Sequence, residues 1–271
     1  MVLVALAAAV LAPAAPGGTA EISPLDPARY DLIDLTHPLN ASTVFWPTSP
    51  GGFEMKRLAY GETPGGYFYS ANSIATPEHG GTHLDAPIHF SESGRTVERV
   101  PLKQLVAAAV VLDVSVQAKA NPDYRASIQD IRDFESHHGR IPAGAIALLR
   151  TGWSRRYPDR KSYLGDDTPN DASHLHFPSF GVEAARMLIV ERKVAALGVD
   201  TASIDYGPSA DFPVHRLASA HNIPGLENLS SLERLPPKGA LVIALPIKIE
   251  GGSGAPIRAI ALVEKRAAAG N

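Results

Sequence analysis

Short apolar runs, some alternating with polar residues and others apolar throughout, recur along most of the chain. Runs of this kind, bounded by Gly, Pro, Asn and Asp, are typical of β-strands. They predict strands at residues 30–39, 53–60, 67–76, 107–114, 144–153, 194–201, 239–249 and 257–264. The sequence GETPGG between the second and third of these runs predicts a turn.

Helical periodicity is rarer, and only two or three helices are expected. The segment 127–139 repeats apolar residues at helical spacing, begins at a capping Ser127 and stops at Gly139. The segment VEAARMLIVERK carries an apolar stripe, and we expect Ser179 to cap it. Residues 157–180 have no period and are rich in turn-forming residues, which predicts a long surface excursion. The pattern predicts a compact α/β fold with a mixed sheet in a single domain.

Composition narrows the function classes. The 271 residues are 45% hydrophobic and 20% charged with a net charge of −3, which is typical of a globular domain with a sizeable core. No Lys/Arg run suggests a nucleic-acid partner. The chain has no cysteine, which excludes disulfides and thiolate metal ligands. Any metal must therefore be held by His, Asp and Glu.

The N-terminus differs in composition from the rest of the chain. Its apolar run of about a dozen residues is too short to span a bilayer. Small residues and prolines follow and end in GTA at 18–20, a plausible cleavage site. This pattern indicates that residues 1–20 form a secretory signal peptide, although the positively charged start of such a peptide is missing. We therefore expect export to the periplasm or medium, with a cytoplasmic location as the alternative, and a single folded domain at 21–271.

The sequence HGGTHLDAPIHF concentrates candidate ligands: His79, His83, Asp85 and His89. These residues all have odd numbers, so an extended chain would place them on one face. A straight strand would separate His79 from His83 by about 13 Å, whereas two ligands of one metal each need a bond of about 2.1 Å. The chain must therefore bend, and Gly80–Gly81 lies where the bend is required.

Other interpretations of this stretch are weaker. A helix would also bring together residues four apart, but the two glycines and the prolines at 77 and 87 argue against one. The histidines could cluster without function, in the core or on the surface. The letters HGG resemble the oxyanion loop of serine hydrolases, but the chain lacks the required Gly-x-Ser-x-Gly elbow. His89 lies beyond Pro87, so it is either a fourth ligand or, as we prefer, a free general acid/base.

The pattern His-x-Gly-Thr-His-x-Asp-x-Pro-x-His-Phe resembles the signature of the metal-dependent cyclase family, which includes bacterial kynurenine formamidases and isatin hydrolases. The resemblance extends through most of residues 31–264. The blocks that carry it are DLTHPLNASTVFWP, GVDTASIDYGPSADFPVH, HNIPGLENL and LPIKIEGGSGAPIRAIAL. It implies a swivelling β/β/α fold and assembly as a homodimer.

The resemblance also implies a ligand set. His79, His83 and Asp85 match the ligands of a first metal. Asp85 matches a carboxylate that bridges to a second metal, which His215 and the bridging Glu227 also hold. The separation of His215 from Glu227 by twelve residues is the family spacing. These ligand types suit Zn²⁺, one or two per chain, and also Mn²⁺.

Two further roles follow from the resemblance. His89 matches the general acid/base, and Trp46 matches a tryptophan that lines the substrate pocket. The remaining histidines match no ligand position and are expected on the surface or in loops: His37, His137, His138, His174, His176 and His221.

Together these features predict a metal-dependent hydrolase that cleaves a small aromatic amide, and the resemblance implies N-formylkynurenine as the default substrate. A cyclic amide such as isatin is an alternative within the same chemistry. An alternative of another class is a non-catalytic protein that binds a metal or small molecule, although simple binding would not require His89. The expected partner is a small molecule, and no membrane span is expected.

Overall fold

The computed structural model describes residues 27–265, so the expected signal peptide at residues 1–20 lies outside the described residues. The strands are β1 (Tyr30–Asp34), β2 (Glu54–Glu62), β3 (Phe68–Ala75), β4 (His83–Asp85), β5 (Val106–Asp113), β6 (Arg125–Ala126), β7 (Ile146–Arg150), β8 (Ser179–Phe180), β9 (Ala196–Val199), β10 (Gly225–Glu227), β11 (Lys238–Pro246) and β12 (Gly254–Glu264). The α-helices are α1 (Leu102–Leu105), α2 (Ser115–Ala120), α3 (Ile128–His138), α4 (Arg160–Leu164), α5 (Val182–Arg186) and α6 (Pro213–Ala220).

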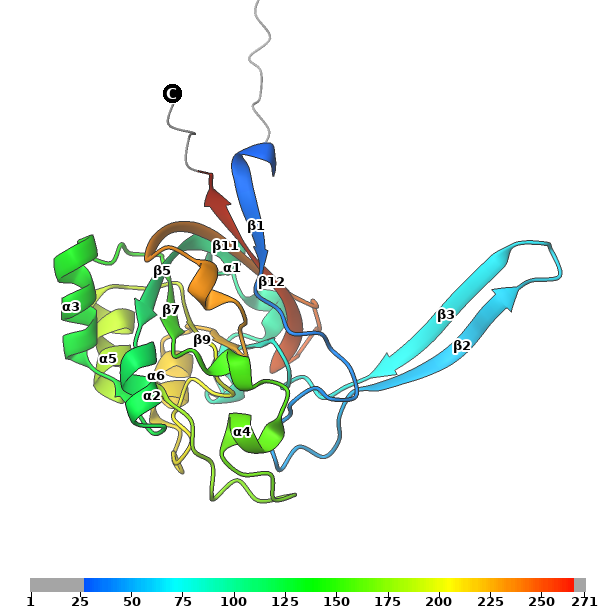
Figure 1. Ribbon diagram of the computed structural model, residues 1–271, viewed down its shortest axis with the longest axis horizontal. Coiled ribbons are helices and arrows are strands. Elements are labelled where there is room, and N and C mark those ends of the chain that lie inside the picture. Colours follow the sequence, from blue (N-terminus) through cyan, green and yellow to red (C-terminus); the bar gives the residue numbers. More distant parts are fainter. Residues whose placement is uncertain (1–26, 266–271) are drawn as a thin grey trace, which may run out of the picture.

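An eight-stranded mixed sheet forms the body of the molecule (Figure 1). Its order is β1-β12-β11-β5-β7-β9-β10-β4, and β4 also pairs with β12. The sheet therefore closes on itself in the manner of a small barrel, with the short strand β4 completing the ring. The pairs β5–β7, β7–β9 and β9–β10 are parallel and the others are antiparallel. The predicted α/β class with a mixed sheet is confirmed.

Apolar side chains fill both faces of the parallel strands. One cluster fills the inside of the closed sheet and includes Leu84, Ile146 and Val242. A second lies outside it, where α3, α5 and α6 cover the sheet. This arrangement follows from the sequence, because parallel strands that are buried on both sides must be apolar throughout. Among the described residues, no helix has the length and apolar character needed to cross a bilayer.

The helix predictions have mixed outcomes. The N-cap at Ser127 is confirmed, with a capping box to Asp130, and α3 ends before Gly139. The Ser179 cap is wrong, because α5 begins after Gly181. Ser179 instead lies in β8, where its hydroxyl donates to a backbone carbonyl at 2.7 Å. The expected total of two or three helices is too low, since short helices of one or two turns show little periodicity.

The prediction of a surface excursion at 157–180 is wrong in part. The segment carries α4, and Tyr163, Leu164 and Phe177 are fully buried in a third cluster that also contains Trp153. A helix as short as α4 and widely spaced aromatic residues produce no regular pattern of apolar positions in the sequence. Their side chains nevertheless pack into a buried cluster.

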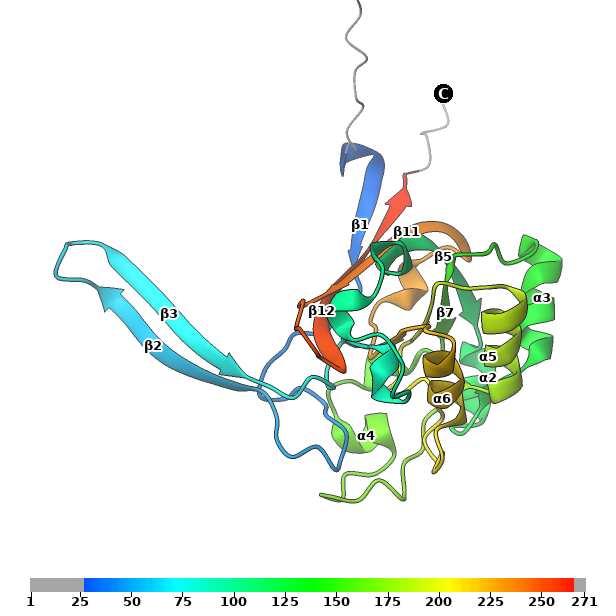
Figure 2. The same ribbon diagram turned by 180° about the vertical axis from the view of Figure 1, so that it is seen from behind.

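The predicted strands at 53–60 and 67–76 form a separate two-stranded hairpin, β2–β3, which projects far from the body (Figures 1 and 2). We call it the arm, residues 54–75. By contrast, the first predicted strand is shorter than expected, because β1 ends at Asp34, four residues before Pro38.

Candidate metal centre and substrate pocket

The centre of the site is the seam where β4 closes the sheet. His83 and Asp85 lie two residues apart on β4, so both side chains point to the same face. Glu227 of β10 lies directly opposite His83 in the antiparallel register. All three side chains are buried. The pairing of β4 therefore places two carboxylates and one imidazole together at a position where water is largely excluded.

Glycines make this seam possible. Gly81 has φ of +58°, a conformation that side chains disfavour, and it provides the predicted bend. A Cβ on Gly80 would lie 2.1 Å from the ring of Phe45, and a Cβ on Gly254 would lie 2.4 Å from the ring of His79. The bend brings His79 back onto Asp85, with Nδ1 at 2.6 Å from the carboxylate.

His215 enters the site from α6, a helix that was not expected from the sequence. Asp205 accepts hydrogen bonds from the backbone N–H groups of Val214 and His215, each at 2.9 Å, and so caps the first turn. The same carboxylate lies 2.7 Å from Nδ1 of His215. Nε2 is left facing the site, at 3.0 Å from Asp85 and 3.1 Å from Glu227.

The other two imidazoles are oriented in the same way. Nδ1 of His83 lies 2.9 Å from the carbonyl of Gly81, a partner that can only accept. Nε2 of His79 lies 2.9 Å from the hydroxyl of Ser253, whose own proton is donated to Glu78. In each case the nitrogen outside the site donates a proton, so the neutral ring turns its lone pair towards the carboxylates.

This arrangement lacks a donor at its centre. The inward nitrogens of His79, His83 and His215 all face the oxygens of Asp85 and Glu227, so acceptors face acceptors. Either added protons or a bound cation must relieve that repulsion. Nitrogen and carboxylate donors together are the set that Zn²⁺ and Mn²⁺ take in proteins. The residues therefore fit a divalent metal.

The pKa values express the same imbalance. Burial alone would lower the pKa of His83, but the charges of Asp85 and Glu227 raise it to about 9. Burial would also lower the pKa of His215, yet its hydrogen bonds to Asp205 and Asp85 hold it well above 6.5. Burial together with the charge of Asp85 raises the pKa of Glu227. The site thus attracts positive charge strongly.

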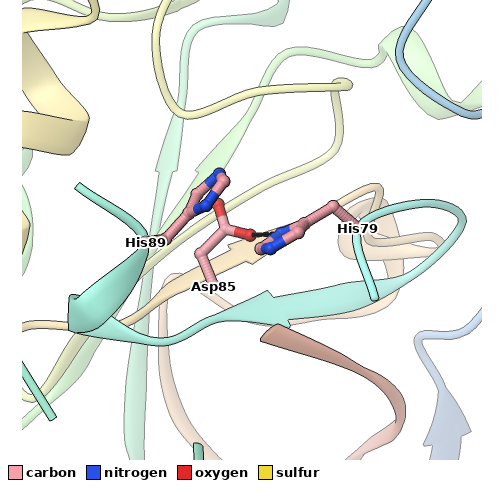
Figure 3. Close-up of side chains that lie close together, drawn as sticks. All are labelled: His79, Asp85 and His89. Atoms are coloured by element: carbon pink, nitrogen blue, oxygen red, sulfur yellow. Dashed lines mark hydrogen bonds and ion pairs between the residues drawn. The ribbon is translucent and has the colours of Figure 1, made fainter. Parts of the chain in front are cut away.

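His89 differs from these ligands. Its ring stacks on that of His79, with centroids 3.9 Å apart, and both rings lie beside Asp85 (Figure 3). Neither nitrogen makes a hydrogen bond within residues 27–265. Burial lowers the pKa of His89 to about 4, so the ring is neutral near pH 7. Since one atom each from His79, Asp85 and His89 could share an ion, both roles considered for His89 are compatible with its position.

A cavity of about 350 Å³ opens above the metal-ligand cluster. Trp46, Phe90 and Phe212 line it, and Trp46 contacts Phe212 with ring centroids 6.0 Å apart. Phe212 precedes α6 with φ of +48°, a strained conformation for a residue with a side chain. Trp46 was expected at the pocket from the sequence, but Phe212 was not. The available signal was the motif ADFPVH, in which Phe212 directly precedes the first turn of the helix that carries the proposed ligand His215.

Sequence reasoning also missed the residues that orient the ligands, namely Glu78, Asp205 and Ser253. The sequence did contain a signal for them. Glu78 directly precedes the proposed ligand His79, and Asp205 and Ser253 lie inside blocks that carry the family resemblance. His37 lies in a loop, as expected, but it is half-buried, and its ring stacks on that of Tyr157 with centroids 3.9 Å apart. The other histidines without a role are exposed, as expected: His137, His138, His174, His176 and His221.

Comparison with known proteins agrees with this geometry. The family model described as “Putative cyclase” matches residues 33–206. The isatin hydrolase of Roseibium aggregatum is 35% identical over 208 residues, covering 74% of this chain and 77% of that protein. A kynurenine formamidase of Salinibacter ruber is 29% identical over 235 residues, covering 84% and 96%. The crystal structure of an isatin hydrolase bound to the product analogue thioisatinate has a TM-score of 0.81 at 31% identity, covering 88% of this chain and 94% of that one. The chain therefore belongs to the cyclase family of metal-dependent hydrolases.

Proposed function

We propose that the protein hydrolyses the amide bond of a small, flat, uncharged aromatic substrate, a cyclic amide of the isatin type. The observation that carries this proposal is the lining of the 350 Å³ cavity. Aromatic rings form its walls, and none of its lining residues, as far as the structure describes the chain, is Lys or Arg. Such a pocket suits an apolar ring system with one polar edge directed at the ligand cluster.

N-formylkynurenine remains the second candidate, because formamidases of the family match most of the chain. That substrate carries an amino-acid carboxylate and ammonium group. Burying a carboxylate without a cationic partner costs free energy, about 1–3 kcal/mol even for an unpaired neutral polar group and more for a charge. The relative at 35% identity is named for isatin, which also supports the cyclic amide.

The residues that would hold the metal are His79, His83, Asp85, His215 and Glu227. One oxygen of Asp85 faces His79 and His83, and the other faces His215. When bound, one or two Zn²⁺ or Mn²⁺ ions would polarise the amide carbonyl and lower the pKa of a water molecule. The aromatic walls hold the substrate ring flat and limit the access of bulk water.

His89 has the properties of a general acid/base. It faces the cavity, is neutral near pH 7 and has an unpaired ring nitrogen. It would accept the proton from the attacking water as the C–O bond forms, and donate it to the amide nitrogen as the C–N bond breaks. In a cyclic amide that nitrogen stays on the aromatic ring, so the product keeps both halves of the substrate.

The test is a comparison of kcat/KM for isatin and N-formylkynurenine after loading the purified protein with Zn²⁺ or Mn²⁺. We expect isatin to be preferred by at least about tenfold, because about 1.4 kcal/mol of difference corresponds to that ratio. A preference for N-formylkynurenine would instead assign the formamidase activity. No turnover of either compound with metal bound would favour the non-catalytic alternative.

A further inference from the structure

Asn228 follows the proposed ligand Glu227 in the chain and lines the cavity above the metal-ligand cluster. Its backbone φ is +53°, in the left-handed region that Asn and Gly enter more easily than other residues. The residue is buried, with only 3% of its surface exposed. A buried polar residue normally has all its hydrogen-bonding groups paired, so the partners of Asn228 can be counted one by one.

Three of the four polar groups of Asn228 are paired within the protein. Its backbone N–H donates to the carbonyl of Thr201 at 2.8 Å. Its backbone carbonyl accepts from the hydroxyl of Thr82 at 2.6 Å, and its side-chain Oδ1 accepts from the hydroxyl of Tyr163 at 3.0 Å. The remaining group, the Nδ2 amide, donates to no acceptor within residues 27–265.

The free amide of Asn228 is open to the cavity. Its Nδ2 atom is accessible, unlike the unpartnered side-chain atoms that are fully enclosed elsewhere in the described part of the chain. Asn228 is otherwise buried, and the space that it lines is the cavity of about 350 Å³. A molecule bound in this cavity can therefore accept a hydrogen bond from the amide.

Tyr163 determines which end of the amide faces the cavity. Its ring is fully buried, and its hydroxyl lies 3.0 Å from Oδ1 of Asn228 and 3.3 Å from the backbone carbonyl of Asp200. Burial, and after it the charge of Asp200, hold the pKa of Tyr163 well above its usual value, so the hydroxyl keeps its proton. Since the hydroxyl donates to Oδ1, the oxygen is held in the core and Nδ2 is directed to the cavity.

Ser203 is a second buried residue of the cavity wall whose proton has no acceptor. Its Oγ accepts from the backbone N–H of Asp205 at 3.1 Å, and its own proton finds no partner within residues 27–265. A hydroxyl proton can rotate, whereas the planar amide held by Tyr163 offers its N–H in a fixed direction. Asn228 is therefore the better placed of the two donors.

We propose that the Nδ2 amide of Asn228 binds the ketone oxygen of a substrate whose aromatic ring carries a ketone next to the amide nitrogen. This inference rests on the proposed function, in which the metal site takes the carbonyl that is attacked. Isatin and N-formylkynurenine share such a ketone, on the ring carbon adjacent to the one that bears nitrogen. A neutral N–H donor suits this uncharged oxygen. Asn228 then selects the substrate class: aromatic amides with an ortho ketone, whether cyclic or open.

The test measures ligand binding by isothermal titration calorimetry with the full chain loaded with Zn²⁺ or Mn²⁺. The probes are phenylglyoxylate and phenylacetate, which resemble a ring-opened product and differ only in the ketone. We expect the unmodified protein to bind phenylglyoxylate at least about tenfold more tightly. In Asn228→Gly the ratio should fall below about twofold, because the donor is lost. Gly accepts a φ of +53°, so this variant does not strain the backbone.

Tyr163→Phe tests the positioning of the amide. The ring stays in the core while the hydroxyl that holds Oδ1 is removed, so the ratio should fall by about threefold with phenylacetate affinity unchanged. The matched control is Asn170→Gly, at an exposed asparagine with φ of +60° that does not line the cavity. This control should keep the full ratio.

A ratio near one in the unmodified protein overturns the proposal. A tenfold ratio that persists in Asn228→Gly also overturns it and assigns the ketone to the metal. A ratio that disappears only in Ser203→Ala overturns it in favour of that hydroxyl. The ratio compares two ligands on one preparation, so incomplete folding or metal loading cancels. Turnover is not measured, so a protein that keeps the ratio but hydrolyses neither candidate would refute the proposed reaction and leave this binding site intact.

Discussion

The strand β4 and the arm β2–β3 contrast in how they place polar and apolar residues. In β4 the polar side chains of His83 and Asp85 are buried between two neighbouring strands. In the arm, the apolar side chains Tyr60 and Phe68 stand in solvent with a single partner strand. Each region reverses the usual rule that apolar residues are inside and polar residues outside.

The contrast shows that both regions are complete only with something the single chain does not contain. Buried carboxylates facing imidazole lone pairs require added protons or a bound cation, since burying uncompensated charge is costly. Exposed aromatic residues on a thin hairpin require a covering surface, since a large exposed apolar patch marks an interaction site. Departure from the normal distribution therefore points to a ligand in one region and to a partner in the other.

The largest effect is expected from Asp85→Asn, which removes the carboxylate that faces all three inward imidazoles. The neutral amide cannot compensate a divalent ion, so metal content and turnover should both collapse, with kcat/KM falling about a thousandfold or more. Elemental mass spectrometry and steady-state kinetics measure the two quantities. Normal metal content in this variant would contradict the cation argument.

His89→Ala should reduce turnover by about 10²–10⁴-fold while metal content stays unchanged, because a general acid/base is lost but the ligands are kept. The outcome also decides between the two roles of His89. Loss of metal along with turnover would make His89 a ligand, and unaltered turnover would remove it from the mechanism.

The free energy of unfolding should fall much more for a truncation in β4 than for one in the arm. Leu84, between the two ligands of β4, is completely buried, so Leu84→Ala should cost about 2–5 kcal/mol in the free energy of unfolding. Tyr69→Ala, at an exposed side chain of the arm, should change it by less than about 0.5 kcal/mol. Urea unfolding of both variants compares them directly, and equal losses would show that the arm is part of the core.

The pH dependence of the metal-free protein follows from His83, whose pKa is raised from 6.5 to about 9 in the folded state. A raised pKa stabilises the fold fully below pH 6.5, and this stabilisation is lost as the pH rises through 9, by an amount of the order of 3 kcal/mol. Metal binding needs the deprotonated ring, so metal affinity should rise over the same interval. Thermal melts with and without metal should therefore show opposite slopes against pH.

The smallest effect is expected from Asp205→Asn. The change weakens the hydrogen bond that fixes the tautomer of His215, which typically lowers metal affinity by about 10–100-fold. Asp211→Asn, at an exposed carboxylate in the same loop, is the matched control. Competition with a chelator measures the affinities, and ¹⁵N spectra of His215 report the tautomer. An unchanged tautomer would leave Asp205 only its role as a helix cap.

The sequence by itself determined the features that depend on neighbours along the chain. The cluster HGGTHLDAPIHF contains its own bend at Gly81, so the approach of His79 to Asp85 could be predicted from spacing and glycine chemistry. Apolar runs predicted most strands, and Ser127 and Gly139 marked the ends of α3. These properties are local, and local backbone preferences decide them.

Only the tertiary structure decided which distant residues meet. The closure of the sheet at β4 places Glu227 opposite His83, and it brings Asp85 to 3.0 Å from Nε2 of His215 on α6. The wrong cap at Ser179 and the buried aromatic residues of 157–180 show the same limit, because strand pairing and core packing overrode local signals there. The exposed face of the arm is also invisible in sequence, since a strand pattern states which residues share a face but not whether anything covers it.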